Sequence, residues 1–230
     1  MIVCTISGRV GYVKLLAETL KWLEVEKYST LSLFVDNTDQ LSLAEVQQLF
    51  PRAQVYKVQH EFSPLSSPDM STRVAFEHFY RSHCNIMVNI DSDTALHPDW
   101  HKFIVDNLGY SQGVLSLYNS AAHGATWCGK GVCSKQTVGA MGVVMTRATV
   151  GKILENVPRR LGGFDWGFVD YFKSQGVEIL VPEKSLALHY GMHGSNGNGT
   201  HIEHAIGFDE SVFPKEMLGR IQLYLDGMAP

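Results

Sequence analysis

Hydrophobic residues in the first half of the chain follow two alternating periodicities. Short apolar runs, typical of buried strands, are separated by stretches in which apolar residues recur every three or four positions, as on one face of a helix. In residues 12–25, for example, Val13, Leu16, Leu20 and Leu23 share one helical face. The pattern predicts strands at residues 2–7, 31–35, 54–59 and 85–90, and helices at residues 12–25, 42–49 and 71–82.

This alternation predicts an α/β fold with a mostly parallel central sheet and helices on both of its faces. In such sheets, ligands bind beyond the carboxyl ends of the strands. Arg9 follows the first predicted strand, Asp36 follows the second, and Asp91-Ser92-Asp93 follows the fourth. We therefore expect these polar residues to converge at one edge of the sheet.

The second half of the chain is less regular. It contains no internal repeat and no clear linker, so we predict a single domain over residues 1–230. Residues 191–199 are rich in glycine and flexible by composition, either as a lid that orders over a ligand or as a surface loop. The remaining patterns predict strands at residues 113–117, 140–146, 177–181 and 185–189, and helices at residues 149–156, 166–175 and 214–225.

Composition and charge exclude several classes of protein. Hydrophobic residues make up 45% of the chain and charged residues 18%, as in ordinary globular proteins. The formal net charge of −4 argues against a nucleic-acid-binding protein, since such domains are usually basic. No apolar run reaches the length of about 18 residues that spans a membrane. The N-terminus also lacks the basic region of a signal peptide, so we expect a cytoplasmic protein without a transmembrane segment.

The chain has four cysteines, Cys4, Cys84, Cys128 and Cys133. Without a secretory signal, reduced thiols are the expectation. Cys128 and Cys133 lie in a Gly-rich segment, where a zinc site is an alternative, although the spacing is not CxxC and no second pair exists.

The strongest chemical signal is Asp91-Ser92-Asp93, directly after a buried strand. In an extended segment, side chains at positions i and i+2 project to the same side. The two carboxylates would repel each other unless a cation lay between them, and oxygen ligands suit Mg²⁺ or Mn²⁺. The alternative is that an aspartate merely caps a turn.

With this motif in place, the sequence resembles the metal-dependent nucleotide-sugar glycosyltransferases of the GT-A fold, similar to family 2-like inverting enzymes. The resemblance covers residues 2–195 and is carried by the order and spacing of residues 3–9, Asp36, Arg73 and the DxD motif. It implies a nucleotide-sugar-binding half, residues 1–95, and an acceptor-binding and catalytic half, residues 96–230. The residues implied to contact the donor are Thr5, Arg9, Asp36, Arg73, Asp91 and Ser92.

The resemblance also implies a metal site and a catalytic base. Asp91 and Asp93 would bind Mn²⁺ or Mg²⁺, with Asp93 as the usual direct ligand. Relatives often place a third ligand after a late strand, which points to His189, with His193 as the competing candidate. Imidazole is an acceptable partner for Mn²⁺ beside two carboxylates.

The base is implied by residues 162–176, where relatives carry an acidic pair that opens a helix ending in glycine. Counting back from Gly176 places Asp165 at the catalytic carboxylate, while the first acid of the pair is replaced by Phe164. Asp165 lies at the predicted N-terminus of that helix, where free backbone N–H groups favour negative charge. A plain N-cap is the alternative.

The sequence therefore predicts an enzyme that transfers a sugar from a UDP-sugar to a hydroxyl of a glycan, a glycoprotein or a small molecule, with inversion. A retaining transferase of the same fold is one alternative. A nucleotidyltransferase is another, although residues 7–11 hold two glycines and one arginine, fewer than such enzymes usually carry. A non-catalytic module that binds carbohydrate or Ca²⁺ is the third.

Overall fold

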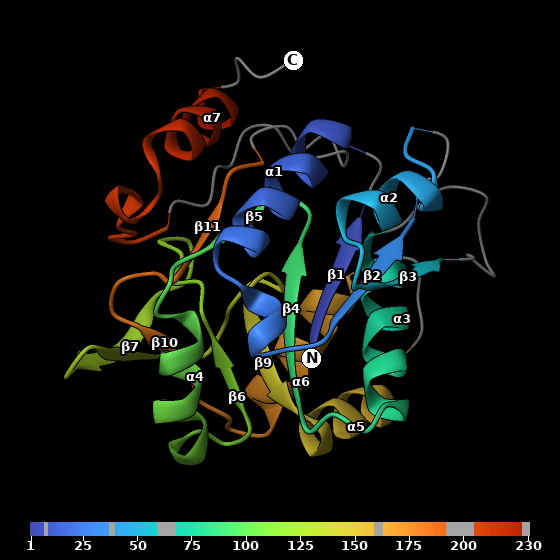
Figure 1. The fold of residues 1–230 in the computed structure, drawn as a ribbon. Coiled ribbons are helices and arrows are strands. Elements are labelled where there is room, and N and C mark those ends of the chain that lie inside the picture. Colours follow the sequence, from blue (N-terminus) through green and yellow to red (C-terminus); the bar gives the residue numbers. More distant parts are fainter. Residues whose placement is uncertain (7–8, 37–39, 59–67, 159–162, 192–204, 227–230) are drawn as a thin grey trace.

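The computed structural model describes residues 1–6, 9–36, 40–58, 68–158, 163–191 and 205–226. Within these residues the chain forms a three-layer α/β structure around one large sheet (Figure 1). The strands are β1 (Ile2–Ile6), β2 (Leu31–Val35), β3 (Gln54–Lys57), β4 (Ile86–Asp91), β5 (Thr94–Leu96), β6 (Val114–Ser116), β7 (Ala125–Gly129), β8 (Val132–Lys135), β9 (Val143–Thr146), β10 (Ile179–Pro182) and β11 (Ala187–His189). The helices are α1 (Val10–Trp22), α2 (Leu43–Leu49), α3 (Pro68–Arg81), α4 (Trp100–Asn107), α5 (Arg147–Asn156), α6 (Phe164–Ser174) and α7 (Lys215–Leu225), with short 3-10 helices at Val25–Lys27, Leu108–Tyr110 and Glu210–Val212.

The large sheet has nine strands in the order β3-β2-β1-β4-β9-β6-β10-β8-β7. β1 pairs in parallel with both β2 and β4, and β2 pairs in parallel with β3. The register places Thr5 opposite Phe34 on one side and opposite Asp91 on the other. The carboxyl ends of β1, β2 and β4 therefore meet at one edge, as the sequence predicts.

The other half of the sheet mixes directions. β9 is antiparallel to both β4 and β6, β10 is parallel to β6, and β8 and β7 add antiparallel strands at the far edge. The predicted mostly parallel α/β sheet is confirmed, and strands from residues 1–95 and 96–230 share it. The patterns did not predict α4, β5, β7 or β8, because β5 has three residues and the side chains of β7 are largely exposed.

Helices cover both faces of the sheet. α1, α2 and α4 pack on one face, where Leu16, Val46 and Trp100 join a cluster with alternate residues of the parallel strands. α3, α5 and α6 pack on the other face, around Phe76 and Phe168. α7 packs on the outer side of α1 in a third cluster that also contains Ala95 of β5 and Leu188 of β11.

Local sequence explains where these helices begin. Ser42 accepts a hydrogen bond from the Glu45 N–H, and the Glu45 carboxylate accepts one from the Ser42 N–H, which is a capping box for α2. Thr146 caps α5 with its hydroxyl alone, which accepts a hydrogen bond from the Thr149 N–H. These caps satisfy backbone donors that would otherwise lack partners at the helix start.

A second sheet contains only β5 and β11. Residues 185–189 were expected to form a strand, but β11 pairs with β5 in antiparallel register instead of joining the large sheet. His189 lies opposite Thr94, and the Tyr190 N–H donates to the Asp93 carbonyl at 3.0 Å. This small sheet brings the end of β11 to the turn that follows β4.

The expectation of four reduced cysteines is wrong at two positions. Cys128 and Cys133 lie opposite each other in the β7–β8 hairpin and form a disulfide, which also rules out the alternative zinc site. Their separation of five residues is the span of a tight hairpin, so the pairing depends on two strands that the sequence patterns did not predict. Cys4 and Cys84 are free thiols.

Among the described residues, no helix is both long and apolar enough to cross a membrane.

Candidate active site

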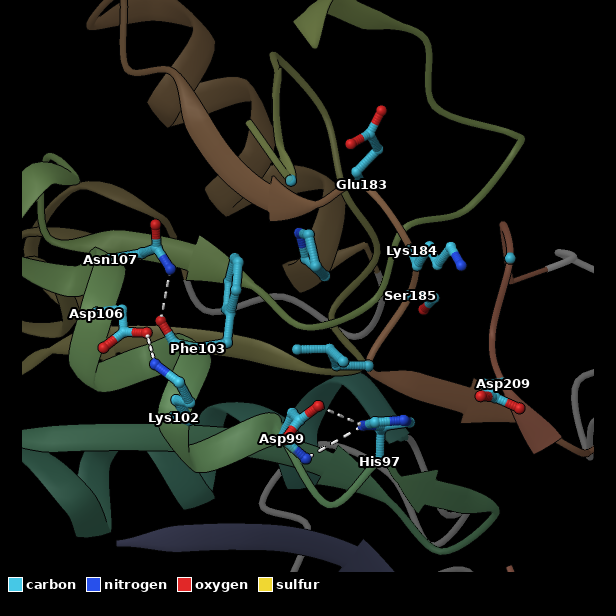
Figure 2. Close-up of a pocket in the computed structure, with 14 residues that line it drawn as sticks. His97, Asp99, Lys102, Phe103, Asp106, Asn107, Glu183, Lys184, Ser185 and Asp209 are labelled. Carbon is cyan, nitrogen blue, oxygen red and sulfur yellow. Dashed lines mark hydrogen bonds and ion pairs between the residues drawn. The ribbon is translucent and has the colours of Figure 1, made fainter. Parts of the chain in front are cut away.

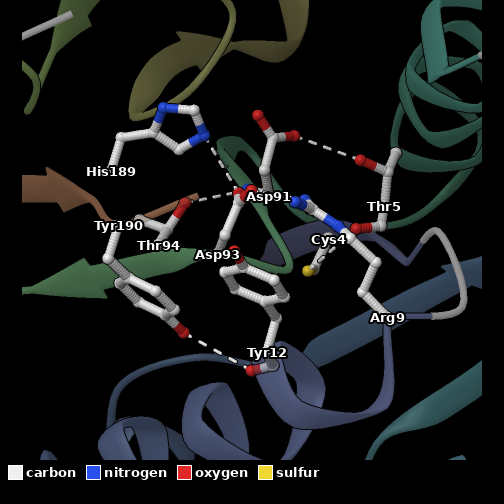
Figure 3. Close-up of polar contacts among 9 residues, drawn as sticks. All are labelled: Cys4, Thr5, Arg9, Tyr12, Asp91, Asp93, Thr94, His189 and Tyr190. Atoms are coloured by element: carbon white, nitrogen blue, oxygen red, sulfur yellow. Dashed lines mark hydrogen bonds and ion pairs between the residues drawn. The ribbon is translucent and has the colours of Figure 1, made fainter. Parts of the chain in front are cut away.

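The DxD motif forms a tight turn. β4 ends at Asp91, the next two residues turn, and β5 begins at Thr94, whose hydroxyl accepts a hydrogen bond from the Asp91 N–H at 3.1 Å. The sequence predicts both aspartates on one extended segment, and that prediction is wrong. The turn, not strand alternation, brings the carboxylates of Asp91 and Asp93 together (Figure 3).

Thr5 holds the first of these carboxylates. Its position opposite Asp91 in the parallel β1–β4 register lets the Thr5 hydroxyl donate to Asp91 Oδ1 at 3.1 Å. Thr5 is buried, and Asp91 is only partly exposed. The strand-end threonine therefore orients Asp91 directly.

Asp93 is held between two basic side chains. Arg9 donates from its guanidinium to Asp93 Oδ2, and His189 Nε2 lies 3.1 Å from Asp93 Oδ1. The Asp93 side chain is 4% exposed, whereas Arg9 and His189 retain 21% and 34%. The carboxylate is therefore buried behind two basic groups that a ligand could reach from outside.

Burial and charge shift the pKa values of the cluster in opposite directions. Burial and the neighbouring Asp93 raise the pKa of Asp91 to about 6. Burial would also raise the pKa of Asp93, but the charges of His189 and Arg9 outweigh it and hold that pKa well below its usual value. Burial would lower the pKa of His189, yet its ion pair with Asp93 raises it to about 9. Strongly shifted, interacting groups at a strand edge are typical of functional sites.

Aromatic rings support Arg9 from below. The guanidinium lies 4.3 Å from the centre of the Tyr12 ring. That ring stacks on the Tyr190 ring, with 5.8 Å between the ring centres, and its centre lies 4.4 Å from that of the Tyr224 ring of α7. The Tyr190 hydroxyl also donates to the Tyr12 carbonyl at 3.4 Å. Helix α7 therefore reaches the site through these rings.

A glycine is required beside Asp93. A Cβ atom at Gly191 would lie 1.9 Å from Asp93 Oδ2 and 2.7 Å from its Cγ, both far inside contact distance. Only glycine lets the chain after β11 pass so close to the carboxylate. This close approach is the third constraint on Asp93, after Arg9 and His189.

The residues present suit a divalent cation by chemistry but not in their described arrangement. Two carboxylates and an imidazole are acceptable ligands for Mn²⁺. However, no group of three His, Cys, Asp or Glu side chains among the described residues is arranged to hold a metal ion. Arg9 and His189 both engage Asp93, so a cation would have to displace Arg9 from it.

Two other residues expected at the donor site are Asp36, which lies at the same sheet edge, and Ser92, which lies in the β4–β5 turn. Asp36 follows β2 and its N–H donates to the Ile6 carbonyl at 2.9 Å, which places it at the same sheet edge. Ser92, expected to contact the donor, is instead buried inside the β4–β5 turn. His193 and most of the Gly-rich segment lie outside the described residues.

The resemblance implies that Arg73 contacts the donor, whereas in the structure Arg73 binds backbone carbonyls near the end of α5. It is buried on α3, and its guanidinium donates to the Val157 carbonyl at 2.6 Å and the Leu154 carbonyl at 3.3 Å, both near the end of α5. Its Nε pairs with Glu77 at 3.2 Å. These contacts connect α3 to α5, and they engage the Arg73 guanidinium with groups of the protein itself.

Asp165 lies in the first turn of α6, one residue earlier than the predicted helix start, and Gly163 is the N-cap. Its carboxylate accepts a hydrogen bond from the Trp166 N–H at 2.8 Å, and the side chain is partly exposed. Phe164, in place of the first acid, is buried against Phe76. The side chain of Phe164 therefore belongs to the core, and Asp165 is the acid at this helix start.

Sequence reasoning missed the supporting residues Tyr12, Tyr190 and Gly191. Tyr12 lies three residues after Arg9, one helical turn away, so the pairing of the two could have been expected from helical spacing. Nothing local marks Tyr190 or Gly191, whose roles arise from the β5–β11 pairing.

Comparisons with known proteins identify the fold. No protein-family model matches this sequence, and comparison with curated protein sequences gives no match either. Among solved structures, residues 1–349 of TarS from S. aureus in complex with UDP-GlcNAc match with a TM-score of 0.60 and 14% identity, over 87% of this chain and 61% of that one. A second structure of TarS residues 1–349 gives a TM-score of 0.59 at 13% identity, with 58% of its length covered, so this chain spans about three fifths of that fragment.

Two enzymes of similar length to this chain also match. A UDP-glucose pyrophosphorylase gives a TM-score of 0.51 at 10% identity over 100% of both chains. A 4-diphosphocytidyl-2C-methyl-D-erythritol synthase gives 0.51 at 12% identity, over 98% of this chain and 99% of that one. At such identities the likeness is one of fold, and the chain has the GT-A-like α/β fold that these structures share.

Proposed function

We propose that this protein transfers a sugar from a nucleotide-diphosphate donor, with a UDP-sugar as the expected donor, to a hydroxyl acceptor. The observation that carries the proposal is the meeting of Arg9, Asp91, Asp93 and His189 at the carboxyl edge of parallel strands. Ligands of open α/β sheets bind at this edge. The TarS structures that share the fold hold UDP-GlcNAc or UDP, which supports the choice of donor.

The proposed role of Arg9 is to neutralise the donor diphosphate. Its guanidinium is fixed over Tyr12 and retains partial exposure, so it can turn from Asp93 to a phosphate without leaving its support. Arginine binds phosphate oxygens through paired hydrogen bonds. Asp36, at the same edge, would accept hydrogen bonds from the base or ribose of the nucleotide.

We also propose that Asp91, Asp93 and His189 bind Mn²⁺ or Mg²⁺ when the donor is present. When bound, the ion would offset negative charge on the departing diphosphate. His189 must lose its proton to act as a ligand, because only the neutral imidazole has a free lone pair. The exchange of Arg9 from Asp93 to the diphosphate would leave the carboxylate open for this purpose.

The proposed base is Asp165, which would accept the proton of the acceptor hydroxyl as it attacks the anomeric carbon. A base on the face opposite the leaving group gives inversion. The matched pair of variants Asp165→Asn and Asp170→Asn tests this role, because both aspartates lie on α6 and Asp170 is exposed. Asp165→Asn should abolish transfer and keep donor binding, while Asp170→Asn should keep both.

The first experiment is calorimetric titration with UDP-, GDP- and CDP-sugars, in Mn²⁺ and in chelator. A preferred UDP-sugar whose affinity falls in the Asp93→Asn variant supports the proposal. The absence of nucleotide-sugar binding under all conditions contradicts it. Proton NMR of the transferred product then separates inversion from retention.

Nucleotidyl transfer is the second candidate, favoured by the two matched enzymes whose whole length aligns with this chain. The two reactions release different products. Glycosyl transfer releases UDP, whereas nucleotidyl transfer from UTP or CTP to a sugar phosphate releases pyrophosphate. Assays for both products with the same preparation distinguish the candidates.

A further inference from the structure

A pocket of about 620 Å³ lies between α4 and the segment that precedes β11 (Figure 2). Its volume is within the range of about 300–1,000 Å³ that is usual for small-ligand sites. His97 directly follows β5 and lines the pocket, whereas Asp93 directly precedes β5. At about 3.3 Å per residue of strand, roughly 13 Å of backbone separates His97 from Asp93, and the pocket lining contains no residue of the strand-end cluster. The pocket is therefore a separate site.

The charges around this pocket disfavour an anionic ligand. Its lining holds four carboxylates and two lysines, together with His97. The carboxylates are Asp99, Asp106, Glu183 and Asp209, and the lysines are Lys102 and Lys184. A nucleotide or phosphate would be repelled by the excess of acid. A neutral ligand with several hydroxyl groups could instead donate to the carboxylates and accept from the lysines.

The buried lining of the pocket is mostly apolar, with Ser185 as a polar exception whose hydroxyl donates to the Ala187 carbonyl at 2.6 Å. Phe103 and Pro182 are buried, and Leu186 is partly buried beside them. A pyranose ring has an apolar C–H face and a polar hydroxyl edge, and it matches an apolar floor within a polar rim. A lipid would bury the charged side chains of the rim without giving them hydrogen-bond partners. A simple polyanion has no apolar surface to pack against the apolar floor.

Contacts within the protein order part of this rim before any ligand arrives. Lys102 pairs with Asp106 on α4, and the Asn107 amide donates to the Phe103 carbonyl at 2.9 Å. The ring Nδ1 of His97 accepts a hydrogen bond from the Asp99 backbone N–H at 3.1 Å. The backbone N–H of His97 donates to the Leu186 carbonyl at 2.9 Å, which joins the β5 side of the pocket to the segment before β11. A preformed site loses less conformational entropy on binding.

We infer that this pocket binds a neutral saccharide, at a site distinct from the proposed donor site. The volume, rim and floor of the pocket favour such a ligand whether or not the protein transfers a sugar.

The test is a two-dimensional amide NMR titration with neutral trisaccharides of glucose, galactose, mannose or N-acetylglucosamine. The reporters are Gly131 and Gly207, which line the pocket, with Gly151 and Gly176 as reporters elsewhere. The same titration with inorganic phosphate and with UMP tests the charge argument. We expect saturable shifts at Gly131 and Gly207 with at least one trisaccharide, and none there with phosphate or UMP.

Matched double variants test whether the rim makes the contact. Asp99→Ala with Lys184→Ala removes exposed rim side chains, and Asp170→Ala with Lys173→Ala removes the same residue types from α6. The rim variant should bind the trisaccharide at least tenfold more weakly, and the α6 variant should bind it unchanged. Thermal melting checks that both variants remain folded. The inference is overturned if no trisaccharide shifts the pocket glycines, if phosphate or UMP shifts them, or if the rim variant binds as the α6 variant does.

Discussion

Arg9 and Asp93 are 84 positions apart in the sequence, and in the folded protein the guanidinium of Arg9 donates to a carboxylate oxygen of Asp93 (Figure 3). The contact joins the start of α1 to the turn after β4. His189 approaches the other oxygen of the same carboxylate. A donor diphosphate would compete with Asp93 for Arg9, and a cation would compete with Arg9 for Asp93.

Replacement of Arg9 should therefore have opposite effects on two ligands. In Arg9→Ala we expect UDP-sugar affinity to fall about tenfold, equivalent to about 1.4 kcal/mol, because the diphosphate loses its guanidinium partner. Mn²⁺ affinity should rise severalfold, because Asp93 no longer has to be released from an ion pair. Calorimetry measures the UDP-sugar, and electron paramagnetic resonance measures free Mn²⁺. The control is Arg52→Ala, an arginine whose side chain is 80% exposed. A parallel loss of both affinities would contradict the competition.

Gly191 should tolerate no side chain. In Gly191→Ala the new Cβ would lie 1.9 Å from Asp93 Oδ2, so the carboxylate must move away from Arg9 and His189. Without its ion pair, His189 should titrate with a pKa below about 9, closer to its usual 6.5. NMR of the imidazole C–H protons follows that titration directly. Gly219→Ala on α7 is the control, because a Cβ there meets nothing within 4 Å. An unchanged His189 pKa in Gly191→Ala would show that Asp93 had not moved.

Asp91 should destabilise the metal-free protein above pH 6. Burial and Asp93 raise its pKa in the folded state from 3.8 to about 6, so its contribution to stability is fully present below pH 3.8 and is lost as pH rises through 6. Asp91→Asn removes this titration and can still accept the hydrogen bond from Thr5. We expect it to raise the free energy of unfolding by on the order of 2 kcal/mol at pH 8, with a smaller gain near pH 4.

The measurement is urea unfolding in chelator at both pH values. Asp170→Asn, at an exposed position, should show no comparable pH dependence. An Asp91→Asn gain that is equal at pH 4 and pH 8 would mean that the carboxylate is not perturbed in the folded state.

Arg73 should matter for stability and not for donor binding. Arg73→Ala leaves the Val157 and Leu154 carbonyls without their buried donor, so we expect a loss of about 2–4 kcal/mol in the free energy of unfolding. The affinity for UDP-sugars should be unchanged where the variant is folded. Arg81→Ala, at the exposed end of the same helix, is the control. A selective loss of donor affinity in Arg73→Ala would restore the role that the family resemblance implied.

Much of the fold could be predicted because its elements are encoded locally. The periodicity around Leu16 and Leu20 specifies a helix whatever it packs against, and the buried runs of β1, β2 and β4 specify strands. The β7–β8 hairpin was missed because the exposed side chains of β7 carry no hydrophobic alternation and β8 has only four residues. The Cys128–Cys133 disulfide was missed for the same reason.

The sequence by itself determined that Arg9, Asp36 and Asp91 follow strands whose carboxyl ends share one sheet edge, since the order of strands and helices leaves few other topologies. Only the tertiary structure decided that Asp93 lies between Arg9 and His189, and that Arg73 is used within the core. The physical reason is distance along the chain. Local periodicity specifies an element, but the partner of a side chain depends on strand register and on segments that meet only in the folded protein.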